Sequence, residues 1–247
     1  MRAVLMYHSL DDSGSPISVA PAAFERHLDW MTANHVQTPT FSEFTGGSSA
    51  GPALSLTFDD AFANFATEAW PRLRDRNLNA TLYVVSGRCG KTNLWEGEAP
   101  SRIPELPLLD WDELARLAEE GCELGCHTHN HQHLTELHVD RVAAEIAESL
   151  DLIEKRTGQR PTSLAYPFGS YDQEVSKIAN QHVKSACTTE FSLVTDQTMP
   201  MEIPRIDAWY FSQTGLLESF GSSQFANFVK RRRFLRKVKR VLPIFRD

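Results

Sequence analysis

The sequence has few cysteines and no long apolar run, and each absence excludes a class of protein. Its four cysteines, Cys89, Cys122, Cys126 and Cys187, include no C-x-x-C pair, so we expect reduced, mostly buried thiols rather than a disulfide framework. No segment approaches the roughly 18 consecutive apolar residues that a membrane-spanning helix needs. With only 13 glycines and 13 prolines in 247 residues, the chain is neither collagenous nor disordered. A globular chain with a sizeable core remains.

The N-terminus also lacks a secretory signal. Its apolar run, Ala3 to Met6, stops after four residues at Tyr7, whereas the apolar region of a signal peptide is roughly 7–15 residues long. We therefore expect a cytoplasmic protein.

The formal charge of −7 hides an uneven distribution. Residues 230–247 contain nine Lys or Arg and one acid, a net +8, which leaves −15 on residues 1–229. From Phe225 onward apolar residues recur every three to four positions between basic ones, the pattern of a basic amphipathic helix on an anionic membrane surface. A solvated, disordered tail is the alternative. Nucleic acid is not expected as a partner, because the acidic body would repel phosphate. We predict one domain, 1–224, a tail, 225–247, and a peripheral position on the inner face of the membrane; the oligomeric state is left open.

Short apolar runs alternate with stretches of helical periodicity, which predicts an α/β fold with a parallel sheet closed into a barrel. Asp110, with Glu113 three residues later, predicts a capping box. His27 and other histidines within the helical stretches are expected to be solvated. Helices are predicted at 21–34, 64–76, 110–120, 140–157 and 172–181. The predicted strands are 3–8, 53–58, 80–85, 123–126, 163–166, 185–188 and 203–206.

Candidate catalytic and binding residues follow the predicted strands. They are His8, Asp59 and Asp60, His127, Tyr166 to Gly169, and Arg205 to Asp207. In parallel α/β folds, functional groups gather at the carboxyl ends of the strands. These residues are therefore expected to share one site.

Two consecutive carboxylates, Asp59 and Asp60, end an apolar strand. Because adjacent strand residues point to opposite sides, the two acids can serve different purposes. An ordinary Asp-rich turn is the alternative.

Four histidines lie between positions 127 and 133. His127 and His131 are four residues apart, as are His129 and His133, so either pair could bind one metal ion, and the spacing alone does not choose between them. Two histidines with Asp60 would leave open coordination positions, as in catalytic sites for Zn²⁺ or for Co²⁺, Ni²⁺ or Fe²⁺. We expect Zn²⁺.

Three motifs together resemble the polysaccharide deacetylase family, the NodB-homology carbohydrate esterases. They are Thr57-Phe58-Asp59-Asp60, His127-Thr128-x-x-His131 and Tyr166-Pro167-Phe168-Gly169. The resemblance implies a distorted (β/α)7-type barrel that binds a divalent metal and removes acetyl groups from acetylated sugars. It further implies that Asp60, His127 and His131 bind the metal, that Thr128 braces the loop between the two histidines, and that Asp59 is the general base.

The sequence departs from the commonest family pattern at two points. Position 165, where many members have arginine, is Ala165, and no histidine follows His182. The chain is instead similar to a subgroup with Tyr-His at the first strand end and a late Pro-Arg-Ile. This similarity implies that His8 is the general acid and that Arg205 orients or balances Asp59; Asp207 is a candidate to orient either partner.

The turn formed by Tyr166, Pro167, Phe168 and Gly169 is the expected source of a backbone N–H for the oxyanion and of contacts with the substrate. A plain Pro-Gly turn between core aromatics is compatible with that role. The expected function is removal of acetyl from an N-acetylated sugar of a surface polysaccharide, a glycolipid, an oligosaccharide or its precursor. A hydrolase of non-sugar amides and an inactive carbohydrate-binding derivative are the alternatives.

Overall fold

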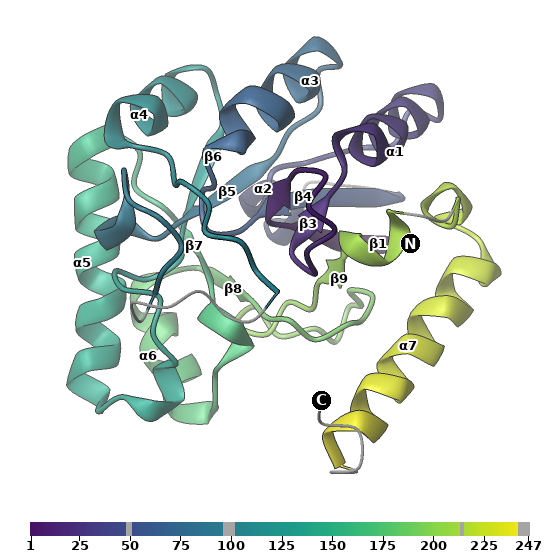
Figure 1. The fold of residues 1–247 in the computed structure, drawn as a ribbon. Coiled ribbons are helices and arrows are strands. Elements are labelled where there is room, and N and C mark those ends of the chain that lie inside the picture. The colour runs from purple at the N-terminus through teal and green to yellow at the C-terminus, as the bar shows by residue number, and fades with distance from the viewer. Residues whose placement is uncertain (48–50, 96–101, 213–214, 242–247) are drawn as a thin grey trace.

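The main sheet consists of seven parallel strands curled into an open barrel (Figure 1). The computed structural model describes residues 1–47, 51–95, 102–212 and 215–241. In spatial order the strands are β8 (Ser185–Cys187), β7 (Ser163–Ala165), β6 (Glu123–Cys126), β5 (Thr81–Val84), β4 (Ala53–Phe58), β1 (Arg2–Tyr7) and β9 (Ile206–Asp207). Two short strands, β2 (Ser9–Leu10) and β3 (Ser18–Val19), pair with each other. The expected (β/α)7-type barrel is confirmed.

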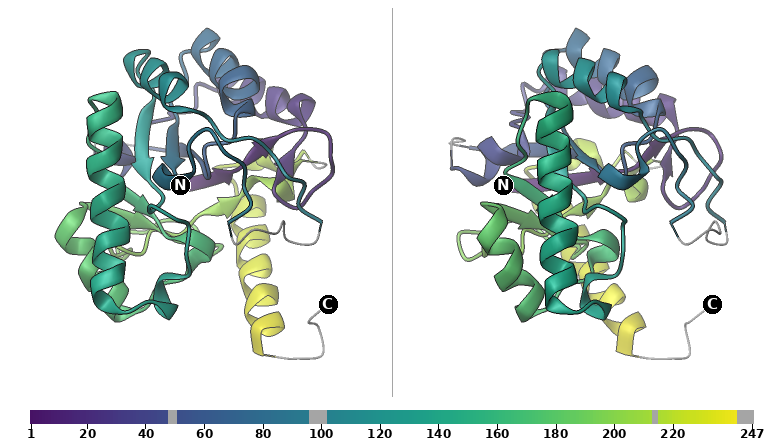
Figure 2. Two further views of the ribbon diagram at one scale, coloured as in Figure 1. Left: turned by 60° about the vertical axis from the view of Figure 1, so that its left-hand side comes forward. Right: turned by 90° about the vertical axis from the view of Figure 1, so that its left-hand side faces the viewer.

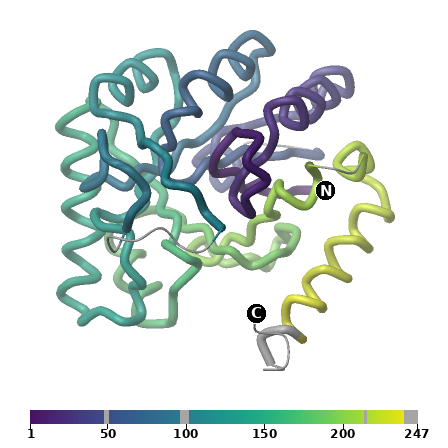
Figure 3. Tube along the Cα trace, viewed as in Figure 1, coloured from purple at the N-terminus to yellow at the C-terminus, as the bar shows by residue number. Residues whose placement is uncertain are grey.

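Most of the helices cover the outer side of the sheet (Figures 2 and 3). They are α1 (Pro21–Ala33), α2 (Phe41–Thr45), α3 (Trp70–Asp75), α4 (Trp111–Glu119), α5 (Val139–Thr157), α6 (Gln173–His182) and α7 (Ser223–Val241). None of the helices in the described ranges is long and apolar enough to cross a bilayer.

The barrel is open between β8 and β9, and the segment connecting these strands spans the opening. Val194 forms an antiparallel bridge with Arg2 of β1, and Ile203 forms a parallel bridge with Cys187 of β8. The predicted strand 203–206 is therefore divided: Ile203 pairs with β8, whereas β9 begins only at Ile206 and pairs with β1. Pro204 lies between the two pairings and lacks the N–H that a continuous ladder requires.

Local signals account for most helix boundaries. Asp110 accepts a hydrogen bond from the Glu113 backbone N–H, and the Glu113 side chain accepts one from the Asp110 backbone N–H, so the predicted capping box is present. The predicted helix 64–76 is instead a π-helical segment, Phe65–Ala69, followed by α3. Pro71 in the first turn of α3 has no N–H to donate, which favours a break in the helical ladder at this point.

The core is densest around β1 and β4, as expected for parallel strands covered on both faces. All six residues of β4 are buried. Tyr7 of β1 stacks on Phe58 of β4, with 5.0 Å between the ring centroids. Phe225 and Val229, in the first turns of α7, are also buried in this core. The beginning of the basic segment is thus packed against the barrel. All four cysteines are free and three are fully buried, which confirms the expectation of reduced thiols.

Candidate metal centre and active site

The candidate functional residues meet at the carboxyl ends of neighbouring strands. Asp59 and Asp60 directly follow β4, His127 follows β6, and His8 follows β1. Arg205 directly precedes β9, next to β1 in the sheet. The sheet order therefore brings together side chains that are up to 197 positions apart in the sequence.

Asp60, His127 and His131 form a compact, buried group that could hold a metal ion. The Oδ1 atom of Asp60 lies 3.4 Å from His127 Nε2 and 3.3 Å from His131 Nε2. One ligand atom from each residue lies within 4.8 Å of the other two. Two imidazoles and one carboxylate are a donor set suited to Zn²⁺ and related divalent ions, with positions left for water and substrate.

Hydrogen bonding around the group also fits a cation. His127 Nδ1 lies 2.7 Å from the Ala165 carbonyl oxygen, which can only accept, so Nδ1 donates and the lone pair is on Nε2. That lone pair faces Asp60 Oδ1, which is buried without a hydrogen-bond partner. Two acceptors facing each other in a buried site are unfavourable unless a cation or proton lies between them.

The pKa values of the three groups respond to burial and to one another. Burial would raise the pKa of Asp60, but the neighbouring histidines outweigh it and lower the pKa. Burial would lower the pKa of His127, but the Asp60 and Asp59 carboxylates raise it. For His131, burial dominates and lowers the pKa to about 3. A neutral His131 imidazole is the form that binds a metal ion.

The loop that carries the histidines is fixed by two side chains. Thr128 Oγ1 accepts a hydrogen bond from the His131 backbone N–H at 3.1 Å, as expected for a bracing residue. Glu145 of α5, fully buried, accepts hydrogen bonds from the backbone N–H groups of His129 and Asn130, at 3.1 and 2.7 Å. Glu145 was not among the predicted site residues, although an acid on the apolar face of a predicted helix, three residues after Val142, is a signal for such a role.

The alternative histidine pair points elsewhere. His129 Nδ1 lies 2.9 Å from Ser86 Oγ, and His133 stacks on Phe168 with 4.0 Å between ring centroids. Among the described residues, the geometry brings only His127 and His131 together with Asp60.

Several residues of the site adopt left-handed backbone conformations that side chains rarely favour. The φ angle is 70° at Asp60, 65° at Thr128, 59° at His131 and 58° at Phe168. Non-glycine residues with positive φ cost energy and persist where surrounding contacts enforce them, which is common at functional sites.

Asp59 is paired with Arg205 rather than with the metal ligands. The two guanidinium nitrogens Nη1 and Nη2 lie 2.6 and 2.7 Å from Oδ1 and Oδ2 of Asp59. Arg205 also donates through Nε to the Thr188 carbonyl at 3.1 Å, and its side chain is fully buried. Burial would raise the pKa of Asp59, but the charge and hydrogen bonds of Arg205, together with the charges of His127 and His8, outweigh it and hold the pKa well below its usual range. Asp59 is thus an ionised carboxylate in fixed orientation.

His8 also lies close to the Asp59 carboxylate. Its Nε2 atom is 3.9 Å from Asp59 Oδ2, and its side chain is 21% exposed, whereas that of Asp59 is 3% exposed. Asp207 accepts a hydrogen bond from the Trp209 backbone N–H at 3.0 Å. Burial raises the pKa of Asp207, an effect that the charge of His8 partly offsets. His8 and Asp207 are therefore close enough for the charge of one to affect the other.

The turn at 166–169 forms one wall of the site. Tyr166 is buried, and its hydroxyl donates to the Met201 carbonyl at 3.2 Å. The backbone N–H groups of Tyr166 and Gly169 donate to the carbonyls of Cys187 and Tyr166, respectively, and Pro167 has none. Among the described residues, no acceptor is found for the Phe168 backbone N–H, the remaining amide of the motif. The Phe168 side chain is 47% exposed.

A cavity of about 160 Å³ lies above these groups. Trp95 borders it and lies against His131, with 4.2 Å between ring centroids. Such a cavity accommodates a small group, the size of an acetamide, rather than a whole polymer chain. Its lining residues are Met6, His8, Ile17, Asp59, Asp60, Phe62, Asn93, Trp95, Ile103, His127, His131, Tyr166, Phe168 and Thr189.

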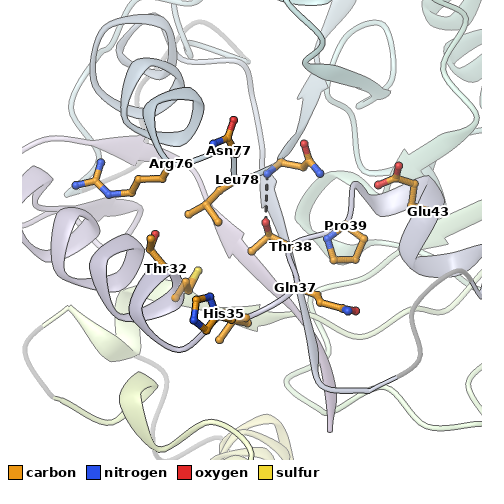
Figure 4. Close-up of a pocket in the computed structure, with 12 residues that line it drawn as sticks. Thr32, His35, Gln37, Thr38, Pro39, Glu43, Arg76, Asn77 and Leu78 are labelled. Atoms are coloured by element: carbon orange, nitrogen blue, oxygen red, sulfur yellow. Dashed lines mark hydrogen bonds between the residues drawn. The ribbon is translucent and has the colours of Figure 1, made fainter.

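A larger hollow, of about 530 Å³, lies beside the amino ends of β4 and β5 (Figure 4). Its walls come from the end of α1 and from the segments that precede α2 and β5. Thr38 Oγ1 accepts a hydrogen bond from the Asn79 backbone N–H there, and Arg76 is paired with Asp29. The hollow is wide and polar, but the charges in it are mostly neutralised by their neighbours. The smaller cavity at the carboxyl ends is the better candidate for catalysis.

Known proteins provide an independent comparison. The chain matches the family profile described as Polysaccharide deacetylase over residues 46–185. The YxkH protein of Bacillus subtilis (strain 168), named as a polysaccharide deacetylase, is 27% identical over 184 residues, or 72% of this chain. This chain spans only 60% of that relative's length.

A second relative is the poly-β-1,6-N-acetyl-D-glucosamine N-deacetylase of Staphylococcus aureus (strain MRSA252). It is 22% identical over 203 residues, which cover 76% of this chain and 67% of the relative. Among solved structures, the Streptococcus pyogenes deacetylase PplD in complex with acetate has a TM-score of 0.71 at 24% identity. That similarity covers 83% of this chain and 91% of PplD, and it shows a shared fold.

Proposed function

The chain belongs to the polysaccharide deacetylase family, and from this we propose that it is a metal-dependent hydrolase that removes an acetyl group from an N-acetylated sugar. The observation that carries the proposal is the buried group Asp60, His127 and His131 beside a second carboxylate, Asp59, that is held apart by Arg205. A binding module has no need for an oriented, ionised carboxylate next to a metal-ligand set, which argues against an inactive derivative.

Asp60, His127 and His131 would hold the ion, for which we propose Zn²⁺, with Co²⁺, Ni²⁺ or Fe²⁺ as alternatives. A divalent ion at this position supplies a Lewis acid for the acetyl carbonyl and makes water a better nucleophile near neutral pH. The protein contributes the fixed ligands, the protonated Nδ1 of His127 and the loop braced by Thr128 and Glu145.

Asp59 is proposed as the general base. A carboxylate has about four lone-pair positions, and Arg205 occupies one on each oxygen, so others remain free to accept a proton from the attacking water. The Arg205 charge keeps Asp59 ionised, and the double contact fixes the plane of the carboxylate. Ionisation and orientation are the two properties that the base requires before each turnover.

His8 is proposed as the general acid that protonates the leaving amine. Its Nε2 atom is near Asp59 Oδ2, and its partial exposure allows it to regain a proton from solvent. We further propose that the Phe168 amide stabilises the negative charge that develops on the carbonyl oxygen. Phe168 and Trp95 present aromatic surfaces at the cavity, where a sugar ring can stack.

The substrates we propose are an acetylated oligosaccharide, a glycolipid or another precursor of a surface polysaccharide. The name of the S. aureus relative specifies an N-acetylglucosamine polymer, which supports an N-acetylhexosamine as the reacting unit. A non-sugar amide remains the alternative substrate, because the catalytic residues act on the amide group itself.

Acetate release combined with metal analysis tests the proposal. The purified protein is loaded with Zn²⁺ and incubated with chitooligosaccharides and with a lipid-linked N-acetylhexosamine. We expect acetate release from at least one substrate. Asp59→Asn should retain metal but lose at least a thousandfold in turnover, of the order seen when essential catalytic groups are removed. The exposed Asp75→Asn is the matched control and should change neither quantity. His8→Ala should slow turnover with metal content unchanged. Metal-loaded protein that releases no acetate from any of these sugars would contradict the proposal.

A further inference from the structure

We propose that α7 docks the protein on an anionic lipid bilayer through the side of the helix that faces away from the barrel. That outer side carries Phe234 together with the cations Lys230, Arg231 and Lys237, and Leu235 lies at its border. The docking itself does not depend on the proposed deacetylase activity.

The inner side of α7 is fully engaged with the barrel. Phe225 stacks on Phe211 with 5.6 Å between ring centroids, and Val229 is buried beside it. Further along, the guanidinium of Arg232 lies 4.5 Å from the Tyr210 ring centroid, and that of Arg236 lies 5.6 Å from Phe191. These contacts recur every three to four residues, which fixes the rotation of the helix about its axis.

The outer side carries one apolar ring among cations, with a second apolar side chain at its border. On a helical projection Phe234, 66% exposed, lies opposite the inner contacts. Leu235, 41% exposed, lies on the flank of the helix, next to Arg232. Lys230, Arg231 and Lys237 are exposed as well. By contrast, Arg233 is paired with Glu190 of the barrel. Figures 1 and 2 show α7 along the edge of the molecule rather than across a face of the sheet.

Exposed large apolar side chains are few in the described parts of the chain, and three of the five lie on this helix or next to a residue that contacts it. Besides Phe234 and Leu235 there are Trp209, Phe168 and Met199. Trp209 is 41% exposed and contacts Tyr210, the ring that Arg232 covers. Exposed tryptophan, phenylalanine and leucine side chains together with basic ones are typical of segments that lie at a membrane interface.

Charge complementarity favours an anionic lipid surface as the partner of the outer side of α7. Each Lys or Arg near an anionic bilayer contributes to binding, and a bilayer also accepts Phe and Leu among its acyl chains. Nucleic acid offers charge complementarity but no apolar layer for Phe234. A second copy of this chain offers an acidic body, yet an isolated Phe-Leu pair is too small a core for a stable dimer interface.

The location of α7 links the docking face to the catalytic cavity. Thr189 lines that cavity and also a hollow of about 220 Å³ whose other walls include Arg233, Arg236 and Lys237 of α7. The backbone on either side of Thr189 accepts hydrogen bonds from Arg205, through the carbonyls of Thr188 and Glu190. Docking through α7 therefore holds the catalytic cavity close to the lipid headgroups. This last step rests on the proposed function and predicts an acetylated sugar that is attached to a membrane lipid.

Vesicle co-sedimentation of the full chain tests the docking. We expect binding to vesicles of phosphatidylcholine mixed with phosphatidylglycerol, weak binding to phosphatidylcholine alone, and a decline as salt increases. Lys230→Gln and Lys237→Gln should each weaken binding about fivefold. Phe234→Ser combined with Leu235→Ser should weaken it about tenfold. Met199→Ser, at a side chain that is 61% exposed and lies outside α7, is the matched control and should bind as the parent does.

Three results of the vesicle assay would each overturn the docking proposal. Binding that is equal on neutral and anionic vesicles, or unchanged in the Phe234/Leu235 variant, would overturn it. So would the absence of vesicle binding at low salt, whether the chain then binds a DNA duplex, dimerises or stays monomeric. Circular dichroism checks that the variants are folded. Because the vesicle assay uses no substrate and the acetate assay uses no vesicles, failure of the docking and failure of the deacetylase proposal are distinguishable.

Discussion

Removing Arg205 should destabilise the protein by leaving the buried Asp59 carboxylate without its counter-charge. The side chains of Arg205 and Asp59 are 0% and 3% exposed and share two hydrogen bonds of 2.6 and 2.7 Å. Breaking such a buried pair by removing one partner costs about 3–5 kcal/mol, because the remaining charge stays desolvated. We therefore expect Arg205→Gln to lower the free energy of unfolding by about 3–5 kcal/mol.

A double-mutant cycle separates this cause from loss of packing. In Arg205→Gln combined with Asp59→Asn, neither side chain is charged and two amides can hydrogen-bond to each other. The double variant should therefore be more stable than Arg205→Gln alone, with a coupling energy of about 2 kcal/mol or more.

Urea unfolding at about pH 8 is the appropriate measurement, since there the carboxylate gains least by taking up a proton. A chelator in all samples removes differences in metal binding, which would otherwise change the apparent stability. The comparison requires that the slope of the unfolding free energy against urea concentration is the same in all variants. A cost of less than about 1 kcal/mol for Arg205→Gln, or single effects that simply add, would mean that no uncompensated buried charge is left behind.

Three further perturbations probe other parts of the structure. Glu145→Gln should weaken Zn²⁺ binding roughly 10–100-fold in a competitive chelator titration, because the loop of metal ligands loses a charged acceptor; the exposed Glu148→Gln should not. Burial lowers the pKa of His27 to about 4, whereas a histidine in the unfolded chain binds a proton near pH 6.5. Between these pH values the unfolded chain is protonated at His27 and the folded chain is not. Stability should therefore fall by up to about 3 kcal/mol as the pH drops from 6.5 to 4, and pH-dependent thermal unfolding of His27→Gln should lack this part of the decline. Gly125→Ala should lower the melting temperature by several degrees, because its methyl group would overlap the Tyr83 ring; an unchanged value would mean that the ring can move aside.

Much of the fold follows from patterns that are visible in the sequence. Six of the seven strands of the main sheet were predicted because each is a short apolar run with a polar or functional residue at its end, whereas the predicted strand 203–206 meets β9 only at Ile206. The two-residue strands β2 and β3 and the five-residue helix α2 were not predicted, because segments this short contain less than one period of a hydrophobic pattern. Their formation depends on tertiary contacts such as the hydrogen bond from the Phe41 N–H to Thr81 Oγ1.

His27 illustrates where sequence reasoning was wrong. A histidine in an amphipathic helix was expected to be solvated, yet it is 2% exposed. Its Nδ1 atom accepts from the Tyr7 hydroxyl at 3.0 Å, while Nε2 faces the Phe211 carbonyl at 3.3 Å. These partners are 20 and 184 residues away in the sequence, so no local pattern could reveal them.

The choice of metal ligands shows the same limit. Spacing alone fitted His129 and His133 as well as His127 and His131, and only the family resemblance favoured the second pair. The structure distinguishes them through contacts distant in sequence, with Ser86 holding His129 and Phe168 stacking on His133. That Asp60, His127 and His131 bind a metal, and that Asp59, His8 and Arg205 are catalytic, remain predictions.

The position of Arg205 explains how the site can lack the arginine that many family members have at position 165. The Ala165 side chain lies in the same buried cluster as Tyr83, and the Arg205 guanidinium lies 5.7 Å from the Tyr83 ring centroid. A positive charge thus reaches this interior region from the segment before β9, which is separated from β7 along the sheet. Ala165 has no charged side chain, but its carbonyl accepts from His127. The site therefore depends on which strand ends converge in space, and here the charge next to Asp59 comes from Arg205.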